Sequence, residues 1–426
     1  MVGERVRPGR RRFPPRPSSV REARQMIRAE LVMAGRDDLV ETAELLVSEI
    51  VTNALVHAGT PVEVAFSFID GGLRIEVTDG SPHAPVPRDY GPNAGTGRGL
   101  MLLQEMVDDW GVVPDQPGKT VWFQIASSAD LDERSPGPSG APEVEQETLT
   151  IELLDVPLLL HEAWRQHAES ILREYLLASL DLDIPEDPLV VHARASDAIA
   201  LLAEHVPASG VADDSDHVMI TATEPLVTSP RVELPVPVRS VANFAILDRA
   251  LASALDMVEG GLFLTPPTQP EVQGLRSWLC EQVAVQSMGG APVPWSAAEE
   301  PPARYIHGLA WDAQPVREAA TGMIAADDED RIVAISEPAL RLLGYADARE
   351  LLGSRLVGII PPRYRQAHLA GFTMHFLSGR ALLVGRTVVV PALRRDGSEV
   401  DLAMTIRTER TEDGRTVFVA DLHPAA

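Results

Sequence analysis

The sequence predicts a multidomain protein in which an α/β domain, a mostly helical middle domain and a small α+β domain follow one another. Three observations support this prediction. The chain has 426 residues, about three times the length of an average domain. Its apolar content of 45% is enough for several hydrophobic cores. Two segments rich in Pro, Gly and acidic residues, 127–148 and 289–312, lack any periodicity and interrupt the chain as linkers.

The first domain, residues 15–126, is predicted to be α/β, with a sheet whose strands lean toward an antiparallel order. Apolar residues at helical spacing predict helices near 18–35 and 37–58, and a third helix near 98–108 after a glycine-rich stretch. Alternating apolar residues, separated by the turn sequences GTP and DGG, predict strands. These strands cover residues 62–69, 73–80, 109–114 and 119–126.

The middle domain, residues 149–288, keeps apolar residues at helical spacing over most of its length. It is therefore predicted to be mostly helical, with a long Pro-rich loop near 206–238. The last domain, residues 313–424, starts with a helix near 313–320. Two strands, a helical stretch that ends in LLGY and three strand-like runs follow. Five strands with short helices between the second and the third predict a small α+β domain.

The net charge of −25 argues against a general nucleic-acid-binding surface, because phosphates require a basic partner. Six arginines lie among the first 16 residues, and residues 1–14 are predicted to be a flexible basic tail. No apolar run approaches the ~20 residues of a membrane span, and the N-terminus lacks the apolar core of a signal peptide. We therefore expect a cytoplasmic protein. The single cysteine, Cys280, excludes an internal disulfide framework and is expected to be a buried thiol.

Three polar side chains lie in a row on the second predicted helix. Glu49, Asn53 and His57 are spaced i, i+4 and i+8, so they share one helix face. The strand that follows the next turn ends in Asp79 and Gly80. A glycine-rich turn, GTGRGL, then opens the third helix. Such a turn offers backbone N–H groups and the positive end of the helix dipole to phosphates, although by itself it is more often a structural turn.

Taken together, the sequences SEIVTNALVHAG, VTDGSP, GTGRGL and GKTVWF resemble, in order and spacing, the ATP-binding domain of the GHKL (Bergerat-fold) superfamily. Within that superfamily they look most like the anti-sigma-factor serine kinases. The resemblance covers about residues 15–126 and implies a two-layer α/β sandwich. The sequence departs from the family's D-x-G-x-G box, because Asp79 is followed by Gly80, Ser81 and Pro82. The lid before Gly95 is also shorter than the lids of sensor histidine kinases.

The resemblance implies a role for each matching residue. Asn53 would coordinate Mg²⁺, which prefers oxygen ligands, and Glu49 would be the general base that activates an acceptor hydroxyl. Asp79, followed by Gly80, would accept a hydrogen bond from the adenine amino group, and Thr120 would lie near the adenine edge. The lid residues that would surround the phosphates are Gly95, Gly97, Arg98, Gly99 and Leu100. If Arg98 does not reach a phosphate, it is a surface charge.

Three further residues are expected to lie outside the chemistry. We expect His57 to be a helix-end or packing residue and Lys119 to be a solvated charge at the end of its strand. His161 precedes Glu162 in a helix, as in the phosphoacceptor segment of a sensor histidine kinase. However, this helix follows the ATP-binding domain instead of preceding it, and the usual proline is missing. An atypical sensor histidine kinase is therefore a less favoured alternative.

The run GMIAADDEDRIVAISEPALRLLGY, the loop IIPP and the sequence RRDGS before a strand, all within 313–424, resemble the landmarks of a PAS sensor domain. The family's frequent Asn before the sequence PA is replaced here by Glu337. PAS domains surround a pocket that can hold haem, a flavin, a metabolite or nothing, so the ligand is open. His368 lies about where haem-binding relatives carry their proximal histidine, which makes haem one option. The leading expectation is a dimerising or small-molecule-binding module.

These observations predict a signalling regulator that binds Mg·ATP under the control of a PAS domain. It would phosphorylate a serine or threonine of an anti-sigma-antagonist-like partner, or sequester a sigma factor. We expect a homodimer that binds neither nucleic acid nor a membrane. The alternative is a non-catalytic switch, in which ATP only sets the affinity for a protein partner. A degenerate site that binds no nucleotide is a third possibility.

Overall fold

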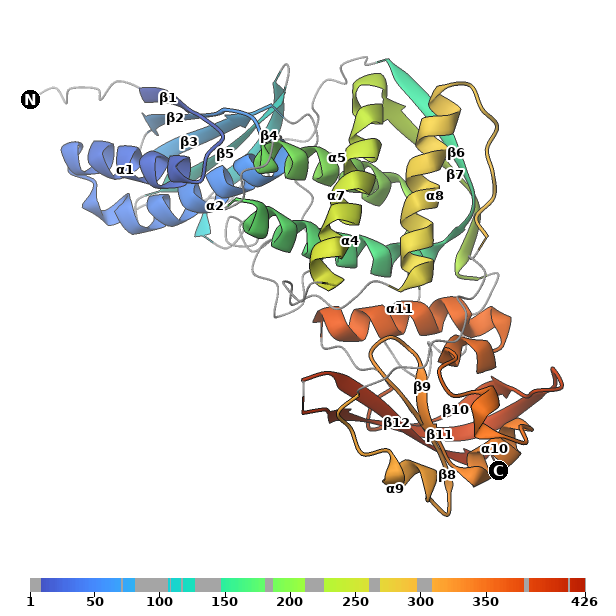
Figure 1. Ribbon diagram of the computed structural model, residues 1–426. Coiled ribbons are helices and arrows are strands. Elements are labelled where there is room, and N and C mark those ends of the chain that lie inside the picture. Colours follow the sequence, from blue (N-terminus) through green and yellow to red (C-terminus); the bar gives the residue numbers. More distant parts are fainter. Residues whose placement is uncertain are drawn as a thin grey trace, which may run out of the picture. The chain divides into compact units, whose positions relative to one another are not determined.

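Figure 1 shows the computed structural model of the 426-residue chain. The chain divides into two compact units. One unit comprises residues 1–149, 172–202 and 235–250, and the other comprises 150–171, 203–234 and 251–426. The segment expected as the middle domain thus contributes to both units. The residues that the structure describes are 9–69, 72–80, 106–107, 109–115, 118–126, 147–180, 187–210, 226–259, 269–296, 309–378, 383–412 and 414–425.

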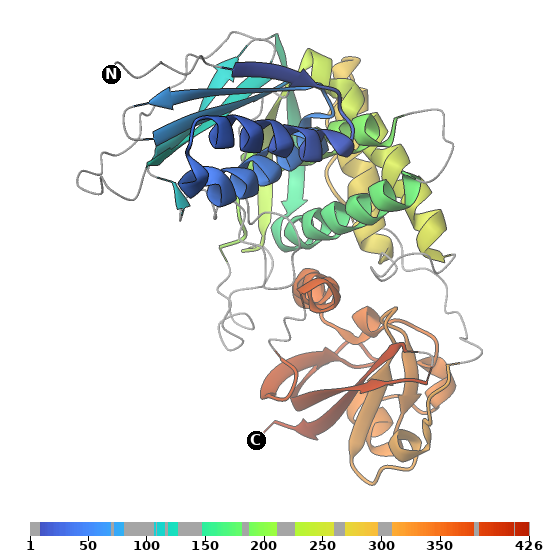
Figure 2. The ribbon, with the colours of Figure 1, turned by 90° about the vertical axis from the view of Figure 1, so that its left-hand side faces the viewer.

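The N-terminal part of the chain is a two-layer arrangement of one sheet and two helices. Its elements are β1 Gly9–Phe13, α1 Ser18–Met33, η1 Asp37–Leu39, α2 Val40–Ala58, β2 Val62–Ile69, β3 Gly72–Asp79, β4 Asp109–Asp115 and β5 Gly118–Ala126. The sheet has the order β1-β2-β3-β5-β4, and all its neighbouring strands run antiparallel. Helices α1 and α2 lie side by side on one face of this sheet (Figures 1 and 2). The predicted α/β layering with an antiparallel sheet is therefore confirmed for this part.

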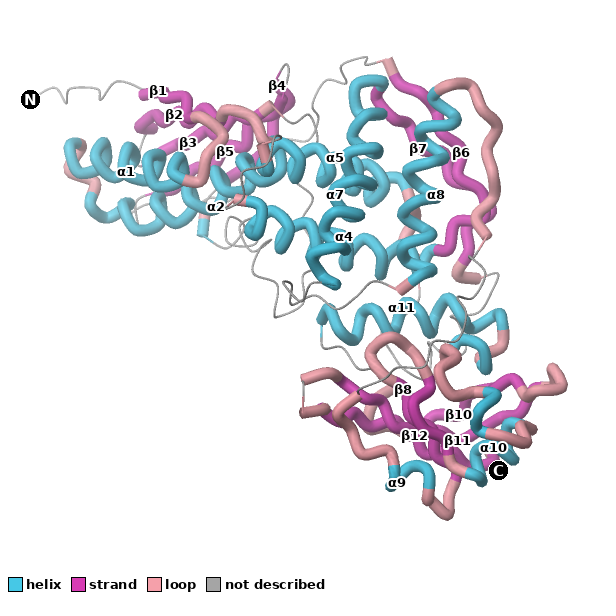
Figure 3. Tube along the Cα trace, viewed as in Figure 1, coloured by secondary structure: helices cyan, strands magenta, loops and turns pink. Residues whose placement is uncertain are grey.

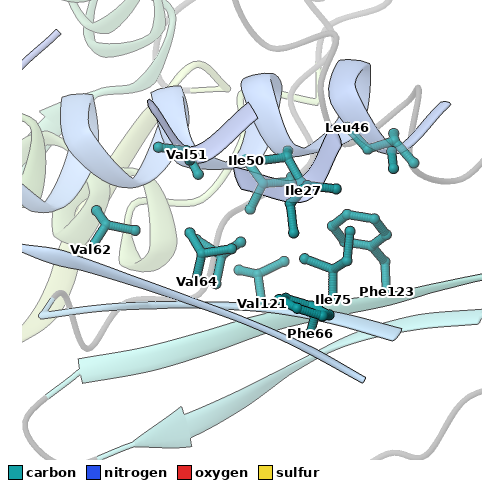
Figure 4. Packing of buried hydrophobic residues seen from close by; sticks show 14 of the residues in the cluster. Ile27, Leu46, Ile50, Val51, Val62, Val64, Phe66, Ile75, Val121 and Phe123 are labelled. Carbon is teal, nitrogen blue, oxygen red and sulfur yellow. The ribbon is translucent and has the colours of Figure 1, made fainter. Parts of the chain in front are cut away.

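The core of these two layers follows from the sequence periodicities. Ile27 of α1 and Leu46 and Ile50 of α2 point toward the sheet (Figure 4). They pack against Ile75 of β3 and Phe123 of β5. All five side chains are at most 3% exposed. Apolar residues every three or four positions on a helix and every second position on a strand produce two apolar faces that can only be buried against each other.

Strand β1 shows that the prediction of a flexible tail over residues 1–14 is wrong for residues 9–13. Residues Gly9–Phe13 pair with β2 as an edge strand, from Gly9 opposite Phe66 to Phe13 opposite Val62. Phe13 is 1% exposed and belongs to the core, whereas the three arginines before it are exposed. Charged side chains are common on edge strands, where they discourage pairing with another chain. The arginine run concealed a strand whose single apolar anchor is Phe13.

Two strands and four helices follow. Their bounds are β6 Thr148–Pro157, α4 Leu158–Ser179, α5 Pro188–His205, β7 Thr228–Pro237, η2 Val238–Ser240, α7 Val241–Glu259 and α8 Pro270–Ser287. Strands β6 and β7 form a two-stranded sheet, so the prediction of a loop near 206–238 is wrong over β7. Val232, Leu234 and Val236 are at most 5% exposed, with the period of two that a strand requires. Pro235 and Pro237 obscured that alternation, although proline is tolerated in strands without two paired neighbours.

The C-terminal segment is the predicted α+β domain with five strands. Its elements are α9 Gln314–Arg317, β8 Gly322–Ala326, β9 Ile332–Ile335, α10 Glu337–Leu343, η3 Ala348–Glu350, η4 Leu356–Ile359, α11 Pro362–Ser378, β10 Thr387–Leu393, β11 Glu399–Arg410 and β12 Thr416–Pro424. The sheet order is β10-β11-β12-β8-β9, with antiparallel neighbours throughout. Figure 3 distinguishes these strands from the helices by colour. One apolar cluster includes residues of α10, and a second includes Val316 of α9.

The turn between β8 and β9 buries a carboxyl group whose protonation affects stability. Oδ1 of Asp327 accepts hydrogen bonds from the backbone N–H groups of Glu329 (3.0 Å) and Arg331 (2.9 Å). Burial raises the pKa of Asp327 from 3.8 to about 6, although these two hydrogen bonds act in the opposite direction. Because the folded pKa lies above the unfolded one, this group's contribution to stability is lost as the pH rises from about 4 to about 6.

The variant Asp327→Asn is expected to be more stable than the wild type above pH 6. Asn keeps the Oδ1 acceptor but carries no buried charge, so the gain at pH 8 should reach up to about 3 kcal/mol and should vanish near pH 4. Hydrogen exchange in β8 and β9, measured at pH 5 and pH 8, provides the test. Asp328→Asn is the matched control, because Asp328 pairs with Arg415 and should lose stability. Equal protection of Asp327→Asn and wild type at pH 8 would contradict the expected effect of burial.

Candidate functional site

Helix α2 presents Glu49 and Asn53 beside its buried face. The helix buries seven apolar residues, each at most 4% exposed: Ala43, Leu46, Val47, Ile50, Val51, Ala54 and Leu55. Glu49 and Asn53 are half-buried and lie one turn apart. The helix ends at Gly59, whose φ of 58° is left-handed and whose N–H donates to the Leu55 carbonyl at 3.1 Å. The two polar side chains predicted for catalysis and metal binding therefore share the last turns of a well-anchored helix.

Strand β3 ends in a carboxylate that faces the helices. Leu73, Ile75, Val77 and Asp79 occupy alternate positions, so all four point to the face of the sheet that α1 and α2 cover. The first three contribute to the apolar core, and Asp79 is 4% exposed. A carboxylate with so little contact with water requires a charged or hydrogen-bonding partner.

Lys119 of β5 provides that partner. Asp79 and Lys119 lie directly opposite each other in the antiparallel pair of β3 and β5, so their side chains share one face. The ammonium Nζ lies 3.0 Å from Oδ1 of Asp79, and the side chains are 7% and 2% exposed for Lys119 and Asp79. The prediction of a solvated strand-end charge at Lys119 is therefore wrong. The signal in the sequence is the position of Lys119, which continues the alternation of the buried residues Val121 and Phe123 along β5.

The side chain of Thr120 points to the face of the sheet opposite to that of Lys119. It lies opposite Thr78 in the same strand pair, and the two hydroxyl oxygens are 2.7 Å apart. Both threonines are half-buried and occupy the positions between the core-facing residues. The structure thus brings Asp79 together with Lys119 and places the hydroxyl of Thr120 on the opposite face of the sheet.

Two glycines and one threonine fix the backbone around Asp79. The N–H of Gly80 donates to Oγ1 of Thr60 at 2.8 Å, which ties the end of β3 to the residue that follows the helix-ending Gly59. A Cβ atom on Gly118 would lie only 1.7 Å from the carbonyl oxygen of Asp79, so a side chain at this position is sterically excluded. The carboxylate of Asp79 and the C-terminal end of α2 are therefore held in the same region of the domain.

Several predicted residues lie outside the part of the chain that the structure describes. The lid residues in question are Gly95, Gly97, Arg98, Gly99 and Leu100, together with the side chain of His57. Within the described ranges, no group of three or more His, Cys, Asp or Glu side chains is placed to hold a metal ion. Mg²⁺ at a nucleotide site does not need such a group, because it binds one or two protein oxygens together with phosphates and water. The carboxamide of Asn53 fits that requirement.

The other candidate residues have structural partners or are buried. Burial lowers the pKa of His161 to about 3, and the nearby Arg165 adds to this effect, so the imidazole is neutral in a site that is 4% exposed. Nε2 of His368 lies 2.7 Å from Oδ1 of Asp330, so haem ligation through Nε2 would require breaking this hydrogen bond. Cys280 is buried and forms no disulfide, as predicted. Among the described helices, none combines the length and the apolar character that crossing a membrane requires.

The chain was compared with curated proteins, with solved structures and with models of protein families. No curated protein matches the chain. Among solved structures, the PAS domain of an HTR-like protein from Haloarcula marismortui is 19% identical, with a TM-score of 0.22, and the match covers 26% of this chain and 88% of that one. The RsbU and RsbW domains of Rv1364c from Mycobacterium tuberculosis are 20% identical, with a TM-score of 0.23, over 28% of this chain and 32% of that one. PAS-B of Drosophila melanogaster Cycle is 15% identical, with a TM-score of 0.20, over 24% and 99%.

The family model named histidine kinase-like ATPase domain matches residues 13–125. This segment starts at the last residue of β1 and ends within β5, so it includes both layers and the pair of Asp79 and Lys119. The match does not extend to the remaining residues, and it describes this domain alone. Residues 13–125 of the chain are a histidine kinase-like ATPase domain, which implies that this domain binds ATP.

Proposed function

We propose that this protein is an ATP-dependent signalling regulator that phosphorylates a serine or threonine of a protein partner. The observation that supports the proposal most directly is the buried carboxylate of Asp79 at the end of β3, tied through Thr60 to the end of the helix that carries Glu49 and Asn53. This arrangement combines a hydrogen-bond acceptor for a base with a carboxamide and a carboxylate for phosphate chemistry. The resemblance suggests an anti-sigma-antagonist-like protein as the partner that is phosphorylated, or a sigma factor that the chain sequesters.

Each side chain has a defined task in this proposal. The Asp79 carboxylate accepts a hydrogen bond from the amino group of the adenine. The Asn53 carboxamide oxygen holds Mg²⁺, which supplies charge neutralisation at the phosphates when bound. Glu49, one turn earlier, takes the proton of the acceptor hydroxyl. The predicted lid, Gly95 to Leu100, would offer backbone N–H groups to the phosphates.

Two alternatives make different use of the same domain. In a non-catalytic switch, ATP binds as described but only changes the affinity for a partner. In a sensor histidine kinase, a histidine must be exposed to receive the phosphoryl group. Burial of His161 to 4% exposure argues against that residue as the acceptor. For the C-terminal α+β domain we propose a sensing role, in line with its resemblance to PAS domains.

The variant Asn53→Ala is expected to weaken Mg·ATP binding by about 10–100-fold, the effect of one lost interaction with a charged group. Isothermal titration calorimetry of the full chain with ATP and Mg²⁺ measures this. Thr52→Ala is the matched control, since Thr52 is also half-buried on α2 but lies on a different side of the helix from Asn53. Omitting Mg²⁺ should reduce the affinity of the wild type much more than that of Asn53→Ala. A wild-type chain that binds no Mg·ATP would refute the proposed function.

A further inference from the structure

Lys119 is the only lysine in the 426-residue chain, and its charged group is buried beside Asp79 in the N-terminal domain. Both members of its ion pair with Asp79 are nearly excluded from water. The neighbouring pair on the same face of the two strands is Val77 and Val121, which lie opposite each other. The ion pair therefore stands where the sequence could simply have continued an apolar row.

A gain in folding stability is a weak explanation for a buried ion pair at such a position. Removing two charges from water costs free energy that their attraction only partly returns, and well-packed apolar side chains often stabilise the fold as well or better. A buried pair of charges such as Asp79 and Lys119 is therefore a candidate for a functional role. Within the described part of the chain Lys119 contacts the carboxylate of Asp79, and the role that we consider is its effect on that carboxylate.

The backbone around Asp79 is immobilised on both sides. Thr60 holds the N–H of Gly80, Gly118 approaches the Asp79 carbonyl closely, and the strand pairing sets Lys119 opposite Asp79. With the backbone fixed, the ammonium of Lys119 fixes the carboxylate, at 3.0 Å from Oδ1. A hydrogen-bond acceptor that is already oriented loses little entropy on binding a ligand, so its contribution to affinity and specificity is large.

We propose that Lys119 is a positioning residue that determines base specificity: it keeps Asp79 ionised and oriented, so that the site selects a purine with a 6-amino group over a purine with a 6-oxo group. The inference rests on the proposed nucleotide site. An ionised carboxylate can only accept hydrogen bonds, so it binds an amino group and repels a carbonyl oxygen. A neutral carboxyl group can also donate, and it therefore tolerates the 6-oxo base. Without an ammonium beside it, a buried carboxyl group favours its neutral form.

Affinities for ATP and ITP, measured by calorimetry on the full chain, test this inference, because ITP replaces the 6-amino group of ATP with an oxo group and carries a proton on the adjacent N1 of the same purine ring. The wild type should prefer ATP. The variant Lys119→Met should reduce the ratio of the two affinities at least about tenfold, the scale of one charge-assisted hydrogen bond. Lys119→Arg retains the cation and should restore much of the ratio. A Lys119→Met protein whose two affinities fall by the same factor would show a merely structural role and overturn the inference.

Glu76→Gln is the matched control. Glu76 lies on the same strand as Asp79 but on the opposite face, where it forms an ion pair with Arg74 at 2.9 Å. Its replacement removes an ion pair from β3 without touching the proposed base subsite, and the ratio of ATP to ITP affinity should stay within about twofold of the wild type. A change in the ratio as large as that of Lys119→Met would attribute the effect to strand stability and overturn the inference.

The single lysine also permits a test that needs no variant. In protein labelled with ¹³C-lysine, one side chain gives all the lysine signals, so they report on Lys119 alone. Saturating ATP should shift these signals, whereas inorganic triphosphate, which has no base, should leave them in place. Unshifted signals with bound ATP would overturn the role of Lys119 and leave the nucleotide site intact. A wild type that does not bind ATP in calorimetry would instead refute both proposals.

Discussion

Replacing Glu49 with Gln is expected to reduce phosphoryl transfer by about 10²–10⁴-fold while Mg·ATP binding stays near the wild-type value. The range is that of a lost general base, because Gln keeps the size and position of the side chain but cannot take a proton. Glu49 is half-buried on α2, one turn before Asn53, so its replacement should not disturb the core. Transfer of labelled phosphate from ATP to proteins that co-purify with the full chain, with mass spectrometry of their phosphosites, measures the effect.

A second glutamate on the same helix provides the control. Glu41 is exposed in the first turn of α2, two turns before Glu49, and Glu41→Gln should leave the transfer rate unchanged. The non-catalytic switch makes a different prediction. If ATP only gates partner binding, Glu49→Gln should retain both nucleotide affinity and partner control, and no phosphosite should depend on Glu49. Full transfer activity in Glu49→Gln would refute its role as the general base.

Replacing Arg355 with Met is expected to lower the free energy of unfolding of the unit that contains residues 251–426 by about 3–5 kcal/mol. This is the usual cost of removing one partner of a buried ion pair. Arg355, which precedes η4, is 1% exposed. Its Nη1 lies 2.5 Å from Oε1 of Glu271 in the first turn of α8, and its Nη2 lies 3.5 Å from Oδ2 of Asp330. Both carboxylates would remain buried without their cation, since Glu271 is 6% and Asp330 0% exposed.

Hydrogen exchange is the suitable measurement, because a chain with several domains need not unfold in one step. Protection should fall together in α8 and in the backbone N–H groups that Asp330 binds, those of Leu356 and Val357. Arg363→Met is the control: Arg363 forms an exposed ion pair with Glu399, and its loss should cost less than about 1 kcal/mol. A loss of protection for Arg355→Met no larger than for Arg363→Met would show that the buried pair contributes nothing specific.

Local sequence patterns predicted most of the regular structure. The 3.6-residue period identified α2, and the two-residue alternation identified β2 and β3. These patterns are reliable where each residue's environment depends on its own element, as for the apolar faces of α2 and β3. They failed at β1 and β7, where arginine and proline outnumber the few apolar residues that anchor each strand. There the decisive interaction is pairing with a strand distant in sequence.

In the candidate site, too, some features follow from the local sequence and others depend on strand pairing. From the sequence came the row of Glu49 and Asn53 on one helix face and the position of Asp79 at the end of a strand, because spacing along a single element determines both. The partnership of Asp79 with Lys119, and the turning of Thr120 to the opposite face, depend on the register between β3 and β5, 40 residues apart at the ion pair. A shift of one residue in that register would exchange the faces of the two side chains. Only the tertiary structure determines this register, because it results from the packing of both strands against the same helices.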